Sequence, residues 1–454
     1  MSTDRKLNIG EVDITEKVQQ MRVICTRILD LAKSKGATSA EVGVSQDMGL
    51  SVQVRNGDVE TLEFNQDASF GISVYKGQQK GCATTTDTSD AAIDAAVEAA
   101  CNIARFTSAD PFAGLADAEL MADNIFDLEI DYPVALSPEE CIDSALRCEA
   151  SALATDKSIR QSDGASMSSH RFARVYANSH GFIADMSSTR NSLSCVVIAQ
   201  DENGMQRDYW YTLSRQLKQL QAPEEVGRIA AERTLKRLGA RVMKTQKVPV
   251  LFSPEVARGL LGHFFGAIRG GALYRKSTFL LDSLGQQIFP EFLTIKEQPH
   301  RLGGLASSCF DNEGVTTYER DIVTGGVVQG YILNSYSARK LGMKTTANAG
   351  GLHNVEITDT GHDLEALLKQ MGTGLFVTDV MGQGVNLVSG DYSRGASGFW
   401  VEKGEIQFPV HEVTIAGHLA DMFKNIVAVG NDRDKRSSVV TGSFLVEGMT
   451  LAGN

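Results

Sequence analysis

The sequence predicts an α+β fold in which antiparallel hairpins alternate with separate helices. Asn56-Gly57 joins two segments of alternating apolar and polar residues, and both positions of such a turn favour positive φ, so the pair is a strong hairpin signal. Helix starts are equally clear at Ser137, where Pro138 and two glutamates follow. Hairpin-rich stretches with segregated helices favour antiparallel sheets over a doubly wound parallel fold.

Residues 1–120 are expected to form an N-terminal α/β domain with antiparallel hairpins. Apolar residues spaced three and four apart predict an amphipathic helix over 12–35. After the Asn56-Gly57 hairpin, a second hairpin is expected around Lys76-Gly77, and Ser89 or Asp90 can then cap an Ala-rich helix that runs to Arg105.

Two further regions are expected: a central helix and strand region at 121–245, and a largely antiparallel β domain with few helices at 246–454. In the central region we expect a helix from Ser137 to about 154, a hairpin at Asn203-Gly204 and a helix over 223–238. Its candidate strands are 172–176, 182–186 and 193–198. In the last region, strand 248–252 leads into a helix from Ser253 to about 268, and the alternating run 408–415 predicts another strand.

Composition and charge exclude several classes of protein. The formal net charge of -12, with no basic run, argues against binding to nucleic acid, which requires a basic patch. No apolar stretch reaches the roughly 18 to 20 residues that cross a bilayer, and the N-terminus has no apolar signal core. The seven scattered cysteines form no CxxC pair, which is typical of a reduced cytoplasmic protein. We therefore expect no membrane, no nucleic acid and a cytoplasmic location.

Histidines in this chain do not have the spacing of a common zinc peptidase, which carries two His one helical turn apart with a Glu between them. His411-Glu412 is followed by the next histidine only at His418, in a segment that favours a strand. His263 is the single histidine of helix 253–268, where a core or interface role is the simpler interpretation. These residues predict no metal site and no catalytic residue in this chain.

Two glycine-rich polar segments are candidates for contact with an extended peptide. The segment 348–354 can offer main-chain groups to a peptide strand, and its candidate residues are Asn348, Gly350, Gly351 and Asn354; a plain surface loop is the alternative. The segment 390–395 contains Asp391, Ser393 and Arg394, and we expect a turn there with Asp391 paired to Arg394. Ser393 as a nucleophile would need a His base nearby, which sequence does not place.

Several long stretches resemble the TldD/TldE family, also called PmbA or modulator of DNA gyrase. One of them reads VRNGDVETLEFNQDASFGISVYKGQQKGCATTTD, and the matching stretches lie in order at 54–87, 274–288, 335–354, 371–417 and 422–432. The resemblance implies a dimer of one TldD-like and one TldE-like subunit. Such a pair is a zinc-dependent peptidase that acts on unfolded or short peptides, in peptide maturation and antitoxin degradation.

The resemblance also implies which subunit this is. TldD-like chains carry HExxxH on a central helix and a third ligand, Cys, near the C-terminus. The matching helix here is 253–270, with Glu255 and His263 but no HExxxH, and Thr441-Gly442 lies where Cys-Gly is expected. The chain thus most resembles the TldE/PmbA subunit, with no cofactor of its own, zinc in the TldD-like partner, and a homodimer when made alone. The alternatives are an independent hydrolase that uses Ser393 or His411 and His418, and a non-catalytic regulator that binds a peptide or protein.

Overall fold

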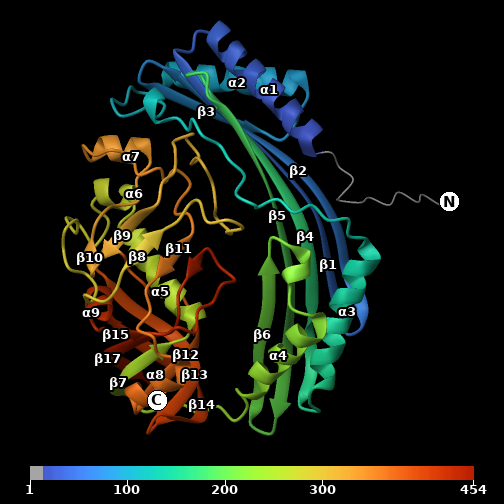
Figure 1. Cartoon of the computed structure of the whole chain (residues 1–454), viewed down its shortest axis with the longest axis vertical. Helices are drawn as coiled ribbons and strands as arrows, with labels where there is room; N and C mark the ends of the chain where they lie inside the picture. Colours follow the sequence, from blue (N-terminus) through green and yellow to red (C-terminus); the bar gives the residue numbers. More distant parts are fainter. Residues whose placement is uncertain (1–13, 454) are drawn as a thin grey trace, which may run out of the picture.

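The computed structural model describes residues 14–453, which form two lobes beside each other (Figure 1). The first lobe is a long curved sheet with helices on its outer side, and the second, coloured yellow to red, faces the other side of this sheet. Positions 12 and 13 of the expected first helix, and the polar N-terminal segment, lie outside the described residues. The α+β prediction is confirmed.

One antiparallel six-stranded sheet forms the first lobe, in the order β3-β2-β1-β4-β5-β6. Four of its strands have 17 to 20 residues, which corresponds to roughly 60 Å of extended chain. Strands from both the 1–120 and the 121–245 segments belong to this sheet, and the boundary between the segments stays a prediction. The strands are β1 (Ser39–Arg55), β2 (Asp58–Lys76), β3 (Gln79–Thr85), β4 (Ile159–Asn178), β5 (Ile183–Asp201) and β6 (Gly204–Ser214).

The three predicted hairpins of this sheet are confirmed. Asn56 and Gly57 both have positive φ, at 54° and 81°, as the tight turn requires. The turns after Lys76 and before Gly204 join β2 to β3 and β5 to β6. The prediction of separate strands at 182–186 and 193–198 was wrong, because residues 183–186 and 193–198 belong to the single strand β5, which pairs with β4 along its length.

Helices cover one face of this sheet and leave the other face to the second lobe. Alternate residues of β1, among them Val42 and Val52, point into two apolar clusters under the helices. On β4 the opposite face carries Phe172, Arg174 and Tyr176, which meet residues of the second lobe. The helices are α1 (Ile14–Ser34), α2 (Asp90–Phe106), α3 (Pro138–Ala154) and α4 (Pro223–Leu235), with short 3-10 turns at Ala118–Leu120 and Leu217–Gln219.

Side chains fix the starts of two of these helices. Ser89, and not Asp90, caps α2 by accepting a hydrogen bond from the amide of Ala92. Ser137 and Glu140 form a capping box at the start of α3, where each side chain bonds the other's backbone N–H. Both caps are local sequence patterns, which is why the helix starts could be predicted.

The second lobe contains a six-stranded and a five-stranded sheet. The first has the order β14-β13-β12-β7-β17-β15, and an additional pairing of β14 with β17 closes its strands into a ring that leaves few open edges. Two of the pairings are parallel, β7 with β12 and β11 with β16. The strands are β7 (Gln246–Phe252), β8 (Ile295–Glu297), β9 (Arg320–Thr324), β10 (Val327–Val328), β11 (Val355–Ile357), β12 (Gly374–Met381), β13 (Asp391–Glu402), β14 (Glu405–His418), β15 (Ile426–Val429), β16 (Val439–Val440) and β17 (Phe444–Ala452).

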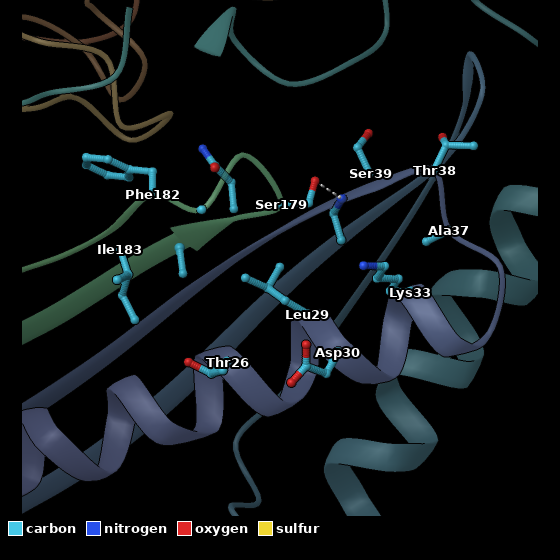
Figure 2. Close-up of a pocket in the computed structure, with 14 residues that line it drawn as sticks. Thr26, Leu29, Asp30, Lys33, Ala37, Thr38, Ser39, Ser179, Phe182 and Ile183 are labelled. Carbon is cyan, nitrogen blue, oxygen red and sulfur yellow. Dashed lines mark hydrogen bonds between the residues drawn. The ribbon is translucent and has the colours of Figure 1, made fainter. Parts of the chain in front are cut away.

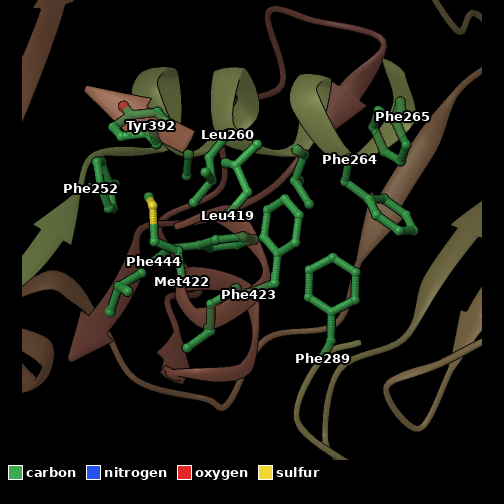
Figure 3. Packing of buried hydrophobic residues seen from close by; sticks show 14 of the residues in the cluster. Phe252, Leu260, Phe264, Phe265, Phe289, Tyr392, Leu419, Met422, Phe423 and Phe444 are labelled. Atoms are coloured by element: carbon green, nitrogen blue, oxygen red, sulfur yellow. The ribbon is translucent and has the colours of Figure 1, made fainter. Parts of the chain in front are cut away.

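An aromatic core holds helix α5 (Pro254–Ala267) against the ring (Figure 3). The Phe264 ring meets Phe289 edge-on at 4.8 Å and Phe423 at 5.9 Å, the geometry that aromatic pairs prefer. The other helices of this lobe are α6 (Gly270–Tyr274), α7 (Ser335–Lys340), α8 (Leu364–Met371) and α9 (Leu419–Lys424). Between residues 14 and 453, no helix has the length and apolar character needed to cross a membrane.

Candidate functional site

A row of three cavities follows the junction between the two lobes. Their volumes are about 630, 560 and 370 Å³, and we call them the first, second and third cavity. Arg433 and Lys435 line both the first and the second cavity, and Leu305 lines both the second and the third. Shared lining residues place the cavities next to one another. The first and third cavities have residues of both lobes in their walls, and the second is lined by the second lobe.

Figure 2 shows a different cavity, of about 540 Å³, between α1 and the turn that joins β4 to β5. Lys33 and Asp30 of α1 line it, and the Ser179 hydroxyl accepts a hydrogen bond from the amide of Ala40 at 3.1 Å. It has no lining residue from the second lobe, so it is separate from the row at the lobe junction.

Charged side chains lock the lobes together at the first cavity, where α5 begins. Glu255 in the first turn of α5 binds Arg233 of α4 at 3.2 Å and Arg436 at 2.8 Å. Arg436 also lies over the ring of Trp210 from β6, at 3.8 Å from the ring centroid. A planar guanidinium that both pairs with a carboxylate and stacks on an aromatic ring fixes its neighbours in direction as well as distance.

His263 lies half-buried on α5, with its ring edge-on to Tyr392 at 6.0 Å. Burial lowers the pKa of His263, and the nearby charge of Arg394 lowers it further. The face of α5 around His263 carries Gly259, Gly262 and Gly266, which bring no metal-binding side chain. A catalytic zinc needs three protein ligands, and the residues around His263 do not fit such a group. Over the whole described range, no three His, Cys, Asp or Glu side chains are placed to hold a metal ion.

Thr441 and Gly442 lie buried at the end of the loop that passes the first cavity. A Cβ atom at position 442 would come within 1.9 Å of the Gly430 carbonyl oxygen, so the chain passes too closely there for any residue but glycine. The Thr441 hydroxyl donates to the carbonyl of Gly442. These residues therefore shape the backbone, and neither offers a soft metal ligand.

Ser393 lies exposed on β13, and no base among residues 14–453 makes a hydrogen bond to its hydroxyl. The segment 390–395 was predicted as a turn with an Asp391–Arg394 pair, which is wrong: Asp391 begins strand β13. Asp391 accepts from the Ser389 hydroxyl at 2.5 Å, and Arg394 donates to the carbonyls of Met381 and Val380. The pairing failed because Ser389 in the preceding turn already binds Asp391, and the carbonyls of β12 already bind Arg394.

The two histidines of β14 have hydrogen-bond partners other than Ser393. The Nε2 atom of His418 lies 2.8 Å from the Ser389 carbonyl, and its Nδ1 atom accepts from the amide of Ala420. His411 lies 3.2 Å from the Gln206 side chain. A bulge at Glu412, whose φ is 52°, interrupts the alternation predicted over 408–415. His418 is therefore not positioned as a base for Ser393, because both of its ring nitrogens are already engaged, and the Nδ1 atom of His411 is directed to Gln206 of β6.

The side chains of Asn348 and Asn354 support the 348–354 loop from inside. Asn348 donates to Glu297 at 2.8 Å and to the Gly351 carbonyl, and Asn354 donates to Ser307 at 2.7 Å. Both amides are buried. Asn354 also lines the second cavity, whereas Asn348 lines none of the three, so Asn348 acts on a ligand only through the loop that it supports.

Gly350 and Gly351 line the third cavity with their backbone. Their φ angles of +100° and +127° are open only to glycine without strain. Within the described residues, the main-chain N–H and C=O groups of Gly350 and Leu352 make no internal hydrogen bond. Such free groups beside a cavity can pair with an extended peptide. Asp391 and Arg394 do not line this cavity, so the six candidate residues are not brought together.

Sequence reasoning missed three arginines, Arg174, Arg190 and Arg215, which also line the third cavity. A signal was available, because Phe172, Arg174 and Tyr176 alternate with apolar residues that face the helices. Strand alternation predicts that such residues share a face. What it could not predict is that this face meets the second lobe.

Comparison with known proteins decides the family. Sequence models of the PmbA/TldA metallopeptidase domain 1, central domain and C-terminal domain match residues 40–104, 131–238 and 245–453. The metalloprotease PmbA of Escherichia coli O157:H7 is 52% identical over 98% of both chains. This chain belongs to the PmbA/TldD metallopeptidase family.

The fold agrees with solved members of the family. A structure described as a modulator of DNA gyrase from Bacteroides thetaiotaomicron superposes with a TM-score of 0.91 and 27% identity, over 96% of this chain and 99% of that one. The family includes chains of both named types. TldE from Thermococcus kodakarensis has the same fold, with a TM-score of 0.84 and 20% identity over 95% of this chain and all of that one. A metalloprotease TldD homologue from Buchnera aphidicola is 20% identical over 95% of this chain and 91% of its own length.

Proposed function

We propose that this chain is the non-metal subunit of a two-subunit peptidase in the cytoplasm, and that it binds unfolded or short peptides for a TldD-like partner that carries zinc. In this division of labour the partner supplies the metal, the activated water and the general base. This chain supplies part of the wall that holds the peptide in an extended form.

The observation that carries the proposal is the contrast between the family and the residues on α5. The chain matches the metallopeptidase family over almost its whole length. Yet the described residues next to His263 offer no second histidine or carboxylate within a turn of the helix. A chain that keeps the fold without a set of three ligands suits a role in binding and assembly.

The row of cavities supports the peptide part of the proposal. Its three cavities lie next to one another, and at the third cavity the main-chain groups of Gly350 and Leu352 are free to pair with another main chain. Recognition through main-chain hydrogen bonds tolerates many side chains and requires an extended ligand, so a folded protein would be refused. Unfolded or short peptides are the class of substrate that meets this requirement.

Hydrolysis assays on a mixture of the two subunits test the proposal. We expect that the purified chain and a TldD-like chain, each inactive alone on a short unstructured peptide, release fragments when mixed, and that a chelator abolishes this activity. Full activity of the TldD-like chain alone would overturn the proposal. So would chelator-insensitive hydrolysis by this chain alone that is lost in Ser393→Ala, which would make it an independent hydrolase.

A further inference from the structure

Three arginines come together in the third cavity of a chain whose net charge is -12. Arg174 lies on β4 and Arg190 on β5, and Arg215 directly follows β6. In the antiparallel register, Ser214 pairs with Asn191, so the next position along the ladder places Arg215 beside Arg190. The sheet itself therefore sets the spacing of these cations.

Arg215 is buried and Arg174 half-buried, and both guanidinium groups are only partly bonded. Arg215 is 9% exposed and donates to the carbonyls of Thr189 and Leu305, and Arg174 donates to Asn312 and Ser308. The Nε–H groups of Arg215 and Arg174 have no acceptor within the described residues. A buried donor without an acceptor is costly, and native proteins keep few of them outside functional sites.

Arg190 is the exposed member of the three. Its side chain makes no hydrogen bond or ion pair with any described residue. Its charge, together with burial, lowers the pKa of Arg215 to about 10, burial being the larger cause. The two arginines thus repel each other across the ladder, and an anion between them would remove this repulsion.

The carboxylates near the cavity already accept hydrogen bonds from other groups of the protein. Asp131 is held by two hydrogen bonds from Arg171, at 3.1 and 2.7 Å. Asp311 lines the cavity, but its carboxylate accepts from three backbone amides, those of Glu313, Val315 and Ala349, and burial raises its pKa. Positive charge therefore remains in excess at the cavity.

We propose that the third cavity is a carboxylate-binding subsite, in which Arg190 and Arg215 hold a carboxylate of a bound peptide while the main-chain groups of Gly350 and Leu352 pair with its main chain. Guanidinium groups match carboxylates in shape and bind them through charge-assisted hydrogen bonds. The inference deepens the proposed function and rests on it, since it names which peptides this chain selects.

The remaining walls of the cavity suit a peptide end. Apolar side chains line it beside the arginines and can receive the side chain next to the carboxylate: Phe172, Met186, Leu305, Phe310 and Leu352. A volume of about 370 Å³ lies near the lower limit of small-molecule pockets, which is enough for one or two residues and not for a longer segment. A C-terminal carboxylate and an acidic side chain share this chemistry, and the experiment separates them.

Binding of dye-labelled hexapeptides to the full chain, followed by fluorescence anisotropy without any partner, tests the subsite. The probes are a peptide with a free C-terminal carboxylate, the same peptide as the C-terminal amide, and an amide with one internal glutamate. We expect the free acid to bind roughly tenfold more tightly than the plain amide, as loss of a charge-assisted pair implies. The glutamate probe shows which carboxylate the subsite binds. If this probe binds as tightly as the free acid, the subsite accepts an acidic side chain. If it binds as weakly as the plain amide, the subsite requires the C-terminal carboxylate.

Arg190→Gln is the decisive variant, because its side chain is exposed and the substitution should leave the fold intact. It should weaken binding of the carboxylate-bearing probe roughly tenfold and leave the plain amide unchanged. Arg160→Gln, at an exposed arginine of β4 outside the cavities, is the matched control and should bind like the parent.

Equal affinity for acid and amide, or an Arg190→Gln variant that binds as the parent does, would overturn the proposal. Competition by inorganic phosphate as strong as by the free acid would overturn it too, in favour of a general anion site. The assay measures binding without hydrolysis, so its failure is distinct from a failure of the proposed function. Hydrolysis by the mixed subunits that persists in Arg190→Gln for acid and amide alike would refute the subsite alone.

Discussion

At the scale of single residues, the environment of His263 predicts how the stability of the fold depends on pH. Burial, followed by the charge of Arg394, lowers its pKa in the folded chain. The unfolded chain therefore binds more protons below about pH 6.5, the usual pKa of histidine, so stability is complete above that pH and falls as pH drops towards the folded pKa. His263→Gln removes this loss. Melting temperatures at about pH 7.5 and 5.5 should differ less in the variant than in the parent.

The expected size of this effect is modest. A full unit of pKa shift would correspond to about 1.4 kcal/mol, and the partial exposure of the ring reduces it well below that figure. His180→Gln, at an exposed histidine, is the control for loss of an imidazole. Parallel pH curves for the parent and His263→Gln would show that His263 does not carry the effect.

At the scale of elements, a buried carboxylate on α3 holds the first hairpin. Glu149 is 1% exposed and accepts from the amides of Asn56 and Gly57 at 2.9 and 2.8 Å. Glu149→Gln keeps the shape but turns an amide N–H towards one of these donors. We expect a loss of about 1–3 kcal/mol in the free energy of unfolding, measured by urea denaturation, and faster hydrogen exchange at Asn56 and Gly57.

Glu139→Gln supplies the matched control for that change, because Glu139 lies exposed on the same helix. It should change the free energy of unfolding by less than about 0.5 kcal/mol. Equal losses for Glu139→Gln and Glu149→Gln would mean that charge on α3, and not the contact with the hairpin turn, stabilises this part of the sheet.

The same elements show what sequence can predict. Local signals, such as the Asn56-Gly57 turn and the capping box at Ser137, were sufficient because each depends on a few adjacent residues. Strand β5 was predicted as two short strands because polar residues interrupt its apolar pattern, although pairing with β4 continues through them. Asp391 begins a strand for a similar reason, since distant residues of β14 pair with it.

The surroundings of the candidate site residues also depend on contacts between distant parts of the chain. Asn348 and Asn354 belong to a polar, glycine-rich segment, as a ligand-binding loop does, but their amides are bonded to Glu297 and Ser307, about 50 positions earlier in the chain. Arg174 and Arg215 were not singled out because only the folded sheet brings them to one cavity. Local pattern thus predicted the loop, whereas the side chains that face its cavity depend on long-range packing.

At the scale of the whole molecule, side-chain contacts hold the two lobes together beside the cavities. Arg436 and Glu255 of the second lobe bind Arg233 and Trp210 of the first, so the row of cavities has walls that are fixed to each other. Preformed walls lower the ordering cost of binding an extended peptide. A rigid binding wall of this kind suits the proposed role of a subunit that presents substrate to a partner.

Measurement of the zinc content tests whether the metal belongs to the TldD-like partner and not to this chain. The residues around His263 on α5 do not form a three-ligand set, so we expect the dialysed, untagged chain to hold fewer than about 0.1 zinc per chain by elemental analysis. Its complex with a TldD-like chain should hold one zinc for each pair, and chelation should remove activity while leaving peptide binding by this chain in place. A ratio near one in the chain alone would contradict the proposal. His263→Ala, His411→Ala and His418→Ala would then show which histidine the metal requires, and a loss of zinc in any of them would make this chain a metal-bearing subunit in its own right.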